Sequence, residues 1–218
     1  MTITAHSGCM GTPENSMESI IAGFENGADI CEIDIRVPDG CGPILSHDDP
    51  KKPEACAKLE DAFAYLASRE TGMYNLDVKD TRNLEQVQAL AERYGVLDRV
   101  FFTGVWPHFV RDVRAKCPKI PYYLNFNMPP AWPRSKAFCR MSRGLIEHYG
   151  AVGLNTNKAN LTQMLVEVFH RRGLPVSVWT ARKEEDLLKC AACGVDNITT
   201  TRPDLRGLVD AQASAADE

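Results

Sequence analysis

Two acidic residues, Glu32 and Asp34, lie two positions apart in a segment that otherwise consists of apolar side chains. They alternate with Cys31, Ile33 and Ile35. Because successive side chains of a strand point to opposite faces, the carboxylates share one face and the apolar side chains share the other. If the apolar face packs against helices, both carboxylates point into the interior of the sheet. Two unpaired carboxylates there would be very costly to desolvate, and a bound cation would relieve that cost.

The segment around Asp77 shows the same alternation. Asn75, Asp77 and Lys79 share one face, opposite Leu76 and Val78. This places a third carboxylate and an ammonium group on the polar side of a second strand.

Two histidines lie close to these segments. His6 ends the first predicted strand, and His47 follows the Glu32 segment in a loop rich in Gly and Pro. An imidazole titrates near pH 6.5, so both of its protonation states are accessible, and a pair of histidines suits acid–base chemistry. Taken together, the residues predict a cation site with histidines beside it.

The elements that must position these residues form a regular alternation of strands and helices. The predicted strands are Thr2–His6, Ile30–Ile35, Met73–Lys79, Val100–Gly104, Tyr122–Phe126, Ala151–Asn155, Pro175–Thr180 and Asp196–Thr200. The predicted helices are 15–27, 57–69, 83–95, 107–116, 134–149, 161–172, 183–193 and 203–212. Asn15, Thr81 and Asn160 are the expected N-caps of the first, third and sixth helices.

Eight strand–helix units in series predict an α/β fold in which a parallel sheet closes into a (β/α)8 TIM barrel. An open doubly wound sheet would also alternate, but Gly8 and Gly11 after the first strand do not form a GxGxxG loop. We expect one barrel domain over residues 1–211 and a disordered tail at 212–218. Active sites of such barrels lie at the carboxyl ends of the strands, where His6 and the acidic residues are expected.

Composition excludes several classes of protein. The chain has 218 residues, 44% hydrophobic and 25% charged, with a net charge of −4 and a pI near 5.8. The acidic balance argues against a nucleic-acid binder. No apolar run is long enough to span a bilayer, and no secretory signal is visible at the N-terminus, so the expected location is the cytoplasm. The eight cysteines are accordingly expected to be reduced thiols.

At this point the chain resembles the glycerophosphodiester phosphodiesterase family, in which the barrel is of the phospholipase C-like phosphodiesterase type. The segments that carry the resemblance are Ala5-His6-Ser7-Gly8, Pro13-Glu14-Asn15-Ser16, Gly27-Ala28-Asp29, Glu32-Ile33-Asp34, Ser46-His47-Asp48, Leu76-Asp77-Val78-Lys79, Val178-Trp179-Thr180, Gly194-Val195-Asp196, Ile198-Thr199-Thr200 and Arg202-Pro203-Asp204. Each fragment is weak by itself, whereas their order and spacing are specific.

The resemblance implies a phosphoric diester hydrolase that converts glycerophosphodiesters, small-molecule substrates, into an alcohol and glycerol phosphate. It implies one divalent metal ion, Ca²⁺ or Mg²⁺, held by Glu32, Asp34 and Asp77. His6 and His47 would be the acid–base pair. Further candidates for substrate binding are Lys79, Trp179, Asn125, Asn155 and Glu14.

Three departures from the family pattern stand out. Ser7 replaces an arginine that usually follows the first histidine, Asp77 replaces a glutamate, and the usual insertion after the second histidine is missing, which predicts a more open site. The Asp77-x-Lys79 form also resembles sphingomyelinase D enzymes. Two alternatives therefore stay open, namely a sphingomyelinase D or lysophospholipase D-like enzyme, and a phosphate-binding barrel with impaired catalysis.

Overall fold

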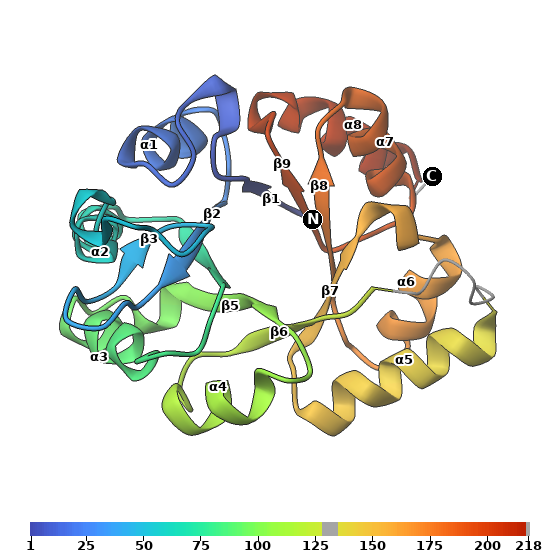
Figure 1. Ribbon diagram of the computed structural model, residues 1–218. Coiled ribbons are helices and arrows are strands. Elements are labelled where there is room, and N and C mark those ends of the chain that lie inside the picture. Colours follow the sequence, from blue (N-terminus) through green and yellow to red (C-terminus); the bar gives the residue numbers. More distant parts are fainter. Residues whose placement is uncertain (128–134, 217–218) are drawn as a thin grey trace.

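The computed structural model describes residues 1–127 and 135–216, with side chains up to residue 212. Eight parallel strands form a closed ring with helices on its outside (Figure 1). These strands are β1 (Thr2–Ala5), β2 (Ile30–Arg36), β4 (Met73–Val78), β5 (Val100–Val105), β6 (Tyr122–Asn125), β7 (Gly153–Asn157), β8 (Val176–Ala181) and β9 (Asn197–Thr200). A short ninth strand, β3 (Ile44–Leu45), runs antiparallel to the end of β2.

The ring closes through β1, which pairs with β9 on one side and with β2 on the other. Neighbouring strands are parallel, which requires a crossover helix between them. The predicted (β/α)8 barrel is thus confirmed, and most predicted strand limits lie within two residues of the observed ones.

The crossover helices surround the barrel as predicted. They are α1 (Met17–Glu25), α2 (Leu59–Ala67), α3 (Glu85–Arg93), α4 (Val110–Lys116), α5 (Lys136–Tyr149), α6 (Gln163–His170), α7 (Glu184–Ala192) and α8 (Arg206–Ala216). Residue 134, the expected start of the fifth helix, lies outside the described residues.

The hydrophobic core lies between the outer faces of the strands and the helices. Ile33, Ile35, Leu76 and Phe102 are almost completely buried there. Because the strands alternate with a period of two, the packing of these side chains directs the polar residues at alternate positions into the barrel.

The three expected N-caps are wrong. Helix α1 is capped by the hydroxyl of Ser16, and α6 by that of Thr162. Neither Asn15, Thr81 nor Asn160 caps its helix, because each amide or hydroxyl contacts a residue from another part of the chain. Tertiary hydrogen bonds therefore decide the use of these side chains.

The end of the chain also differs from the expectation. Helix α8 continues to Ala216, so residues 212–216 are helical and not the disordered tail expected there, while 217–218 lie outside the described residues. Across the part of the chain that the structure describes, no helix has the length and apolar character needed to cross a bilayer.

Candidate active site

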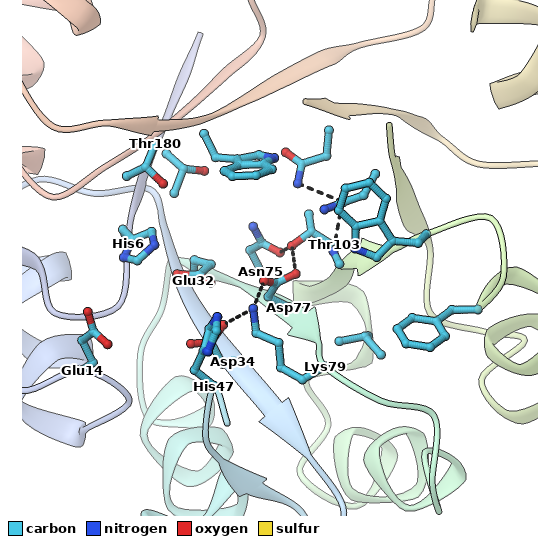
Figure 2. A pocket seen from close by; sticks show the side chains of 18 of the residues that line it. His6, Glu14, Glu32, Asp34, His47, Asn75, Asp77, Lys79, Thr103 and Thr180 are labelled. Atoms are coloured by element: carbon cyan, nitrogen blue, oxygen red, sulfur yellow. Dashed lines mark hydrogen bonds and ion pairs between the residues drawn. The ribbon is translucent and has the colours of Figure 1, made fainter. Parts of the chain in front are cut away.

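A cleft of about 650 Å³ opens at the carboxyl ends of the barrel strands (Figure 2). The structure brings all ten residues expected at the site to its lining: His6, Glu14, Glu32, Asp34, His47, Asp77, Lys79, Asn125, Asn155 and Trp179. They come from segments as far apart as β1 and β8, so closure of the barrel is what assembles the site.

The three carboxylates form a compact cluster in this cleft. Each of Glu32, Asp34 and Asp77 offers an oxygen within 4.8 Å of the others. Asp34 of β2 lies directly beside Asp77 of β4 in the parallel register, which explains their proximity. Glu32 and Asp34 are only 7% and 5% exposed, so the cluster lies inside the barrel mouth, as the alternation predicts.

Burial dominates the electrostatics of the cluster. Loss of solvent, together with the charges of Asp34 and Asp77, raises the pKa of Glu32 well above its usual range. Burial likewise raises the pKa of Asp77, and the Lys79 ammonium offsets part of that rise. When all three carboxylates are ionised, the cluster carries more negative charge than its protein surroundings compensate, which is the situation that a bound cation relieves.

Lys79 is the cationic side chain nearest to the cluster. Its Nζ lies 2.8 Å from Asp34 Oδ1 and 2.6 Å from Asp77 Oδ2. Burial opposes the ammonium charge, but the two carboxylates outweigh it and raise the pKa of Lys79. The side chain consequently stays charged and sits where an anionic group near the cluster would meet it.

The segments before α1 hold the carboxylates in place. The Ser7 backbone N–H donates to Glu32 Oε2 at 2.9 Å. Asn15 makes two bonds to Asp34, since its Nδ2 donates to Oδ2 at 2.8 Å and its Oδ1 accepts from the backbone N–H at 3.0 Å. The backbone N–H of Asn15 in turn donates to the Ser7 hydroxyl. Ser7 and Asn15 thus link β1 and α1 to the acidic cluster.

The two histidines reach the cleft from different strands, His6 after β1 and His47 after β3 (Figure 2). His6 is half-buried, and its Nδ1 lies 2.6 Å from the Ser7 carbonyl oxygen. His47 is 63% exposed, and its Nδ1 lies 2.9 Å from an Asp48 carboxylate oxygen. Through this hydrogen bond the His47 ring lowers the pKa of Asp48.

A guanidinium group fixes the backbone of His47. Arg36 donates from Nε and Nη2 to the His47 carbonyl oxygen, at 3.1 and 2.9 Å. Its Nη1 donates to Asp80 Oδ2 at 2.7 Å, and Arg82 contacts the same carboxylate at 3.0 Å. Residues 48–58 connect His47 to α2, and the Arg36 clamp ties the start of this loop to the end of β2.

Several lining residues were not predicted as site residues. Trp106, His108 and Phe109 enter the cleft from the turn after β5, and Thr103 hydrogen-bonds to both Asn75 and Asp77. His108 is exposed while lining the cleft. Thr103 could have been predicted as a site residue, because it is a polar residue near the carboxyl end of a strand. Nothing in the sequence of the turn after β5 indicates that Trp106, His108 and Phe109 line the cleft.

Gly104 connects the acidic cluster to this turn. It has a φ of +68°, and a Cβ added there would lie 2.6 Å from the Val78 carbonyl oxygen and even closer to an Asp77 carboxylate oxygen. We expect Gly104→Ala to destabilise the protein by about 2–4 kcal/mol, since strain at positive φ adds to overpacking.

Urea denaturation of Gly104→Ala and Gly40→Ala measures this effect. Gly40 has a φ of +73°, but a Cβ there meets nothing within 4 Å, so its variant reports the backbone strain alone. Equal losses of stability in the two variants would contradict the expected collision at Gly104.

The fold and the site together define a class of protein. It is a closed parallel barrel whose cleft, at the carboxyl ends of the strands, is lined by three carboxylates and two histidines. The model of the Glycerophosphoryl diester phosphodiesterase family matches residues 65–205, more than half of the chain. The chain belongs to this family. The matched range includes Asp77, Lys79 and Trp179, and it begins after His47.

Individual relatives extend the similarity to nearly the whole chain. The glycerophosphodiester phosphodiesterase of Caldanaerobacter subterraneus is 23% identical, with 93% of this chain and 94% of that protein covered. The crystal structure of the Agrobacterium tumefaciens glycerophosphodiester phosphodiesterase has a TM-score of 0.71 at 18% identity, covering 97% and 99% of the two chains. A phosphodiesterase of Oleispira antarctica, in complex with its product sn-glycerol-3-phosphate, has a TM-score of 0.73 at 19% identity, covering 97% of each chain.

Proposed function

We propose that the protein hydrolyses glycerophosphodiesters to an alcohol and glycerol phosphate with the aid of one divalent cation. The observation that carries this proposal is the cluster of Glu32, Asp34 and Asp77 in a cleft that two histidines also line. Membership of the family supports the reaction class, and the product bound to the Oleispira antarctica relative supports glycerol phosphate as the retained part.

The acidic cluster fits Mg²⁺ or Ca²⁺. These cations prefer oxygen ligands, and carboxylates are the oxygen donors that proteins supply for them most often. The raised pKa values of Glu32 and Asp77 agree with a site whose negative charge exceeds what Lys79 neutralises. When bound, the cation would polarise the phosphoryl oxygens and attract the anionic diester that bare carboxylates would repel.

His6 and His47 supply the proton transfers in this proposal. In-line displacement at phosphorus needs one group that removes a proton from the nucleophile and another that protonates the departing alkoxide. The histidines approach the cluster from β1 and β3, so they can act on different oxygens of one phosphate. Lys79 places its ammonium beside the cluster, where it pairs with a phosphate oxygen.

The nucleophile is proposed to be the hydroxyl next to the ester oxygen of the glycerol arm. Attack by this hydroxyl is intramolecular and gains the effective molarity of a tethered group. It breaks the bond between phosphorus and the head-group oxygen, and it leaves a five-membered cyclic phosphate that water opens in a second step. The histidines exchange their acid and base roles between the steps.

Phosphorus NMR of the early reaction tests this route against direct attack by water. We expect a transient cyclic phosphate signal from a glycerophosphodiester, and much slower turnover of a diester without the adjacent hydroxyl. Equal turnover of both compounds with no cyclic phosphate would rule out the intramolecular route.

A substrate panel tests the function itself. We expect the purified protein with Mg²⁺ or Ca²⁺ to hydrolyse glycerophosphocholine and related diesters faster than lysophosphatidylcholine or sphingomyelin. Preference for the lysolipid or sphingolipid would favour the sphingomyelinase D-like alternative. Binding of glycerol phosphate without turnover of any diester would favour the phosphate-binding barrel.

Arg36 is proposed as a positioning residue for His47. We expect Arg36→Met to lower kcat by about tenfold or more with little change in KM, because a displaced catalytic group costs rate even when substrate still binds. Steady-state kinetics measures the split, and Arg36→Lys is expected to restore little, since lysine lacks the forked geometry.

Arg206→Met is the matched control for Arg36→Met. The Arg206 guanidinium also bridges a carboxylate, Asp29 at 2.6 Å, and a backbone carbonyl oxygen, that of Gly27 at 3.1 Å, but at the other end of β2. It should lower stability without a comparable loss of kcat. If both variants lose kcat alike, the effect at Arg36 is one of general stability.

A further inference from the structure

The cleft contains two asparagines on neighbouring strands that the proposed chemistry does not use. Asn125 ends β6 and Asn155 lies on β7, directly beside it in the parallel register. Each is only 5% exposed, and both line the cleft. Their amide groups are therefore enclosed polar groups on the side of the barrel that lies across from β1 and His6.

The hydrogen bonds fix which way each amide is turned. The Gly104 backbone N–H can only donate, so the atom of Asn125 that lies 3.0 Å from it is Oδ1. The same oxygen lies 3.0 Å from the amide of Asn155, and that atom must therefore be the donor Nδ2. The remaining atom of Asn155 is Oδ1, an acceptor, and its orientation follows from a backbone N–H two strands away.

This acceptor has no partner within residues 1–127 and 135–216. Asn155 Oδ1 is buried and receives no hydrogen bond from any described residue, and the same holds for the donor Nε1 of Trp179. Unpartnered buried polar atoms are rare in folded proteins because each costs about as much as a lost hydrogen bond. Here an acceptor and a donor without partners line the same cleft, where a ligand can satisfy both.

The register of the strands places these two residues on neighbouring strands of the cleft wall. Asn155 on β7 lies beside Ser177 on β8, and Trp179 follows two residues later. Positions 177 and 179 share the inward face of β8, so Trp179 lies one inward position closer to the carboxyl end. A hydroxyl group suits this pair because it donates one hydrogen bond and accepts others.

We propose that Asn155 and Trp179 form a subsite for the glycerol arm of the diester. The terminal hydroxyl of that arm donates to Asn155 Oδ1, and the Trp179 N–H donates to an oxygen of the same arm. This inference rests on the proposed function. Every glycerophosphodiester has the glycerol arm, whereas the head group varies, so an enclosed subsite with fixed polarity is matched to the constant arm.

The experiment compares two choline diesters in the presence of the divalent cation. One carries the complete glycerol arm, and the other carries a propane-1,2-diol arm, which keeps the hydroxyl next to the ester and lacks only the terminal one. We expect kcat/KM of the unaltered protein to be about 10- to 100-fold lower for the second diester, because the hydroxyl that satisfies the buried acceptor is missing.

The variant Asn155→Ala completes the test. We expect it to lower kcat/KM for the complete diester and to leave that for the shortened one nearly unchanged, so the ratio falls toward one. Asn197→Ala is the matched control, since Asn197 is also a buried barrel asparagine, with hydrogen bonds to Thr4 and Ser177, but it does not line the cleft. Its ratio should stay that of the unaltered protein.

Three results would overturn the subsite. The first is an equal kcat/KM for the two diesters in the unaltered protein. The second is an equal loss of kcat/KM for both diesters in Asn155→Ala. The third is a kcat/KM that depends on a hydroxyl of the head group instead of the terminal hydroxyl of the glycerol arm. If Asn155→Ala does not fold, Trp179→Phe keeps an aromatic ring and removes the N–H, and it should lower kcat/KM for the complete diester by about tenfold.

Failure of the proposed function is distinguishable from failure of the subsite. If neither diester is hydrolysed, the subsite can still be tested by binding. The rise in melting temperature is then measured with glycerol 3-phosphate and with propane-1,2-diol phosphate. A larger shift with glycerol 3-phosphate that disappears in Asn155→Ala supports the subsite. Equal shifts with the two phosphates, in the unaltered protein and in Asn155→Ala alike, overturn the subsite.

Discussion

Exhaustive treatment with a chelator is expected to abolish diester hydrolysis and to lower the melting temperature, and added Mg²⁺ or Ca²⁺ should reverse both effects. The reason is the enclosed cluster of Glu32, Asp34 and Asp77, whose mutual repulsion Lys79 offsets only in part. A cation that binds the native state alone stabilises it by mass action. Full activity after removal of all divalent ions would exclude the proposed metal role.

The variant Glu32→Gln tests whether Glu32 is a metal ligand or a carboxylate with a structural role alone. Its amide oxygen can still accept the hydrogen bond from the Ser7 N–H, while the buried charge is removed. We expect a higher melting temperature than the unaltered protein in chelator, together with loss of activity and of the metal-induced thermal shift. Glu70→Gln, which changes an exposed carboxylate outside the cluster, is the control and should behave like the unaltered protein.

The pH dependence of stability without metal follows from the same shifts. The folded state raises the pKa of Glu32 and of Asp77, so the unfolded chain loses these protons first as pH rises. The folded protein then holds more protons, and the free energy of unfolding falls with increasing pH above the usual carboxyl range. In chelator this decline should be smaller in Glu32→Gln, and an equal decline would contradict the raised pKa of Glu32.

The parts of this protein that the sequence predicted depend on local periodicity. Alternation around Glu32, Asp34 and Asp77 placed three carboxylates inside the barrel, and the structure has them there. Eight repeated strand–helix units then determined the closed sheet, because a parallel neighbour requires a crossover. The first inference needs only the pattern of apolar side chains within one element, and the second needs only the number and order of such elements along the chain.

The parts that could not be predicted depend on contacts between distant segments. Asn15 has the residue type and position of an N-cap, but its amide is held by Asp34, which lies 19 residues further along the chain. Arg36 holds the carbonyl oxygen of His47, which no side-chain pattern reveals. Asn125 lines the cleft, and its Oδ1 accepts hydrogen bonds from Gly104 and Asn155 on the neighbouring strands, which the sequence pattern does not reveal.

Replacing either histidine, as His6→Ala or His47→Ala, is expected to leave a folded barrel and to lower kcat by about 10²- to 10⁴-fold, the usual contribution of a general acid or base. Both residues follow strands at the cleft and contribute little to the core, so stability should change little. The metal-induced thermal shift should also persist, because neither imidazole belongs to the acidic cluster.

His170→Ala provides the matched control. His170 is a half-exposed histidine on α6 that also contacts a carboxylate, Asp196 at 2.7 Å, but it does not line the cleft. The pH profile of kcat adds a readout that a structural role would not move, since loss of one proton-transfer group should remove one limb of a bell-shaped curve. An unaltered kcat and profile in either cleft variant would refute the role of that histidine. A loss as large in His170→Ala would show that the effect does not arise in the cleft.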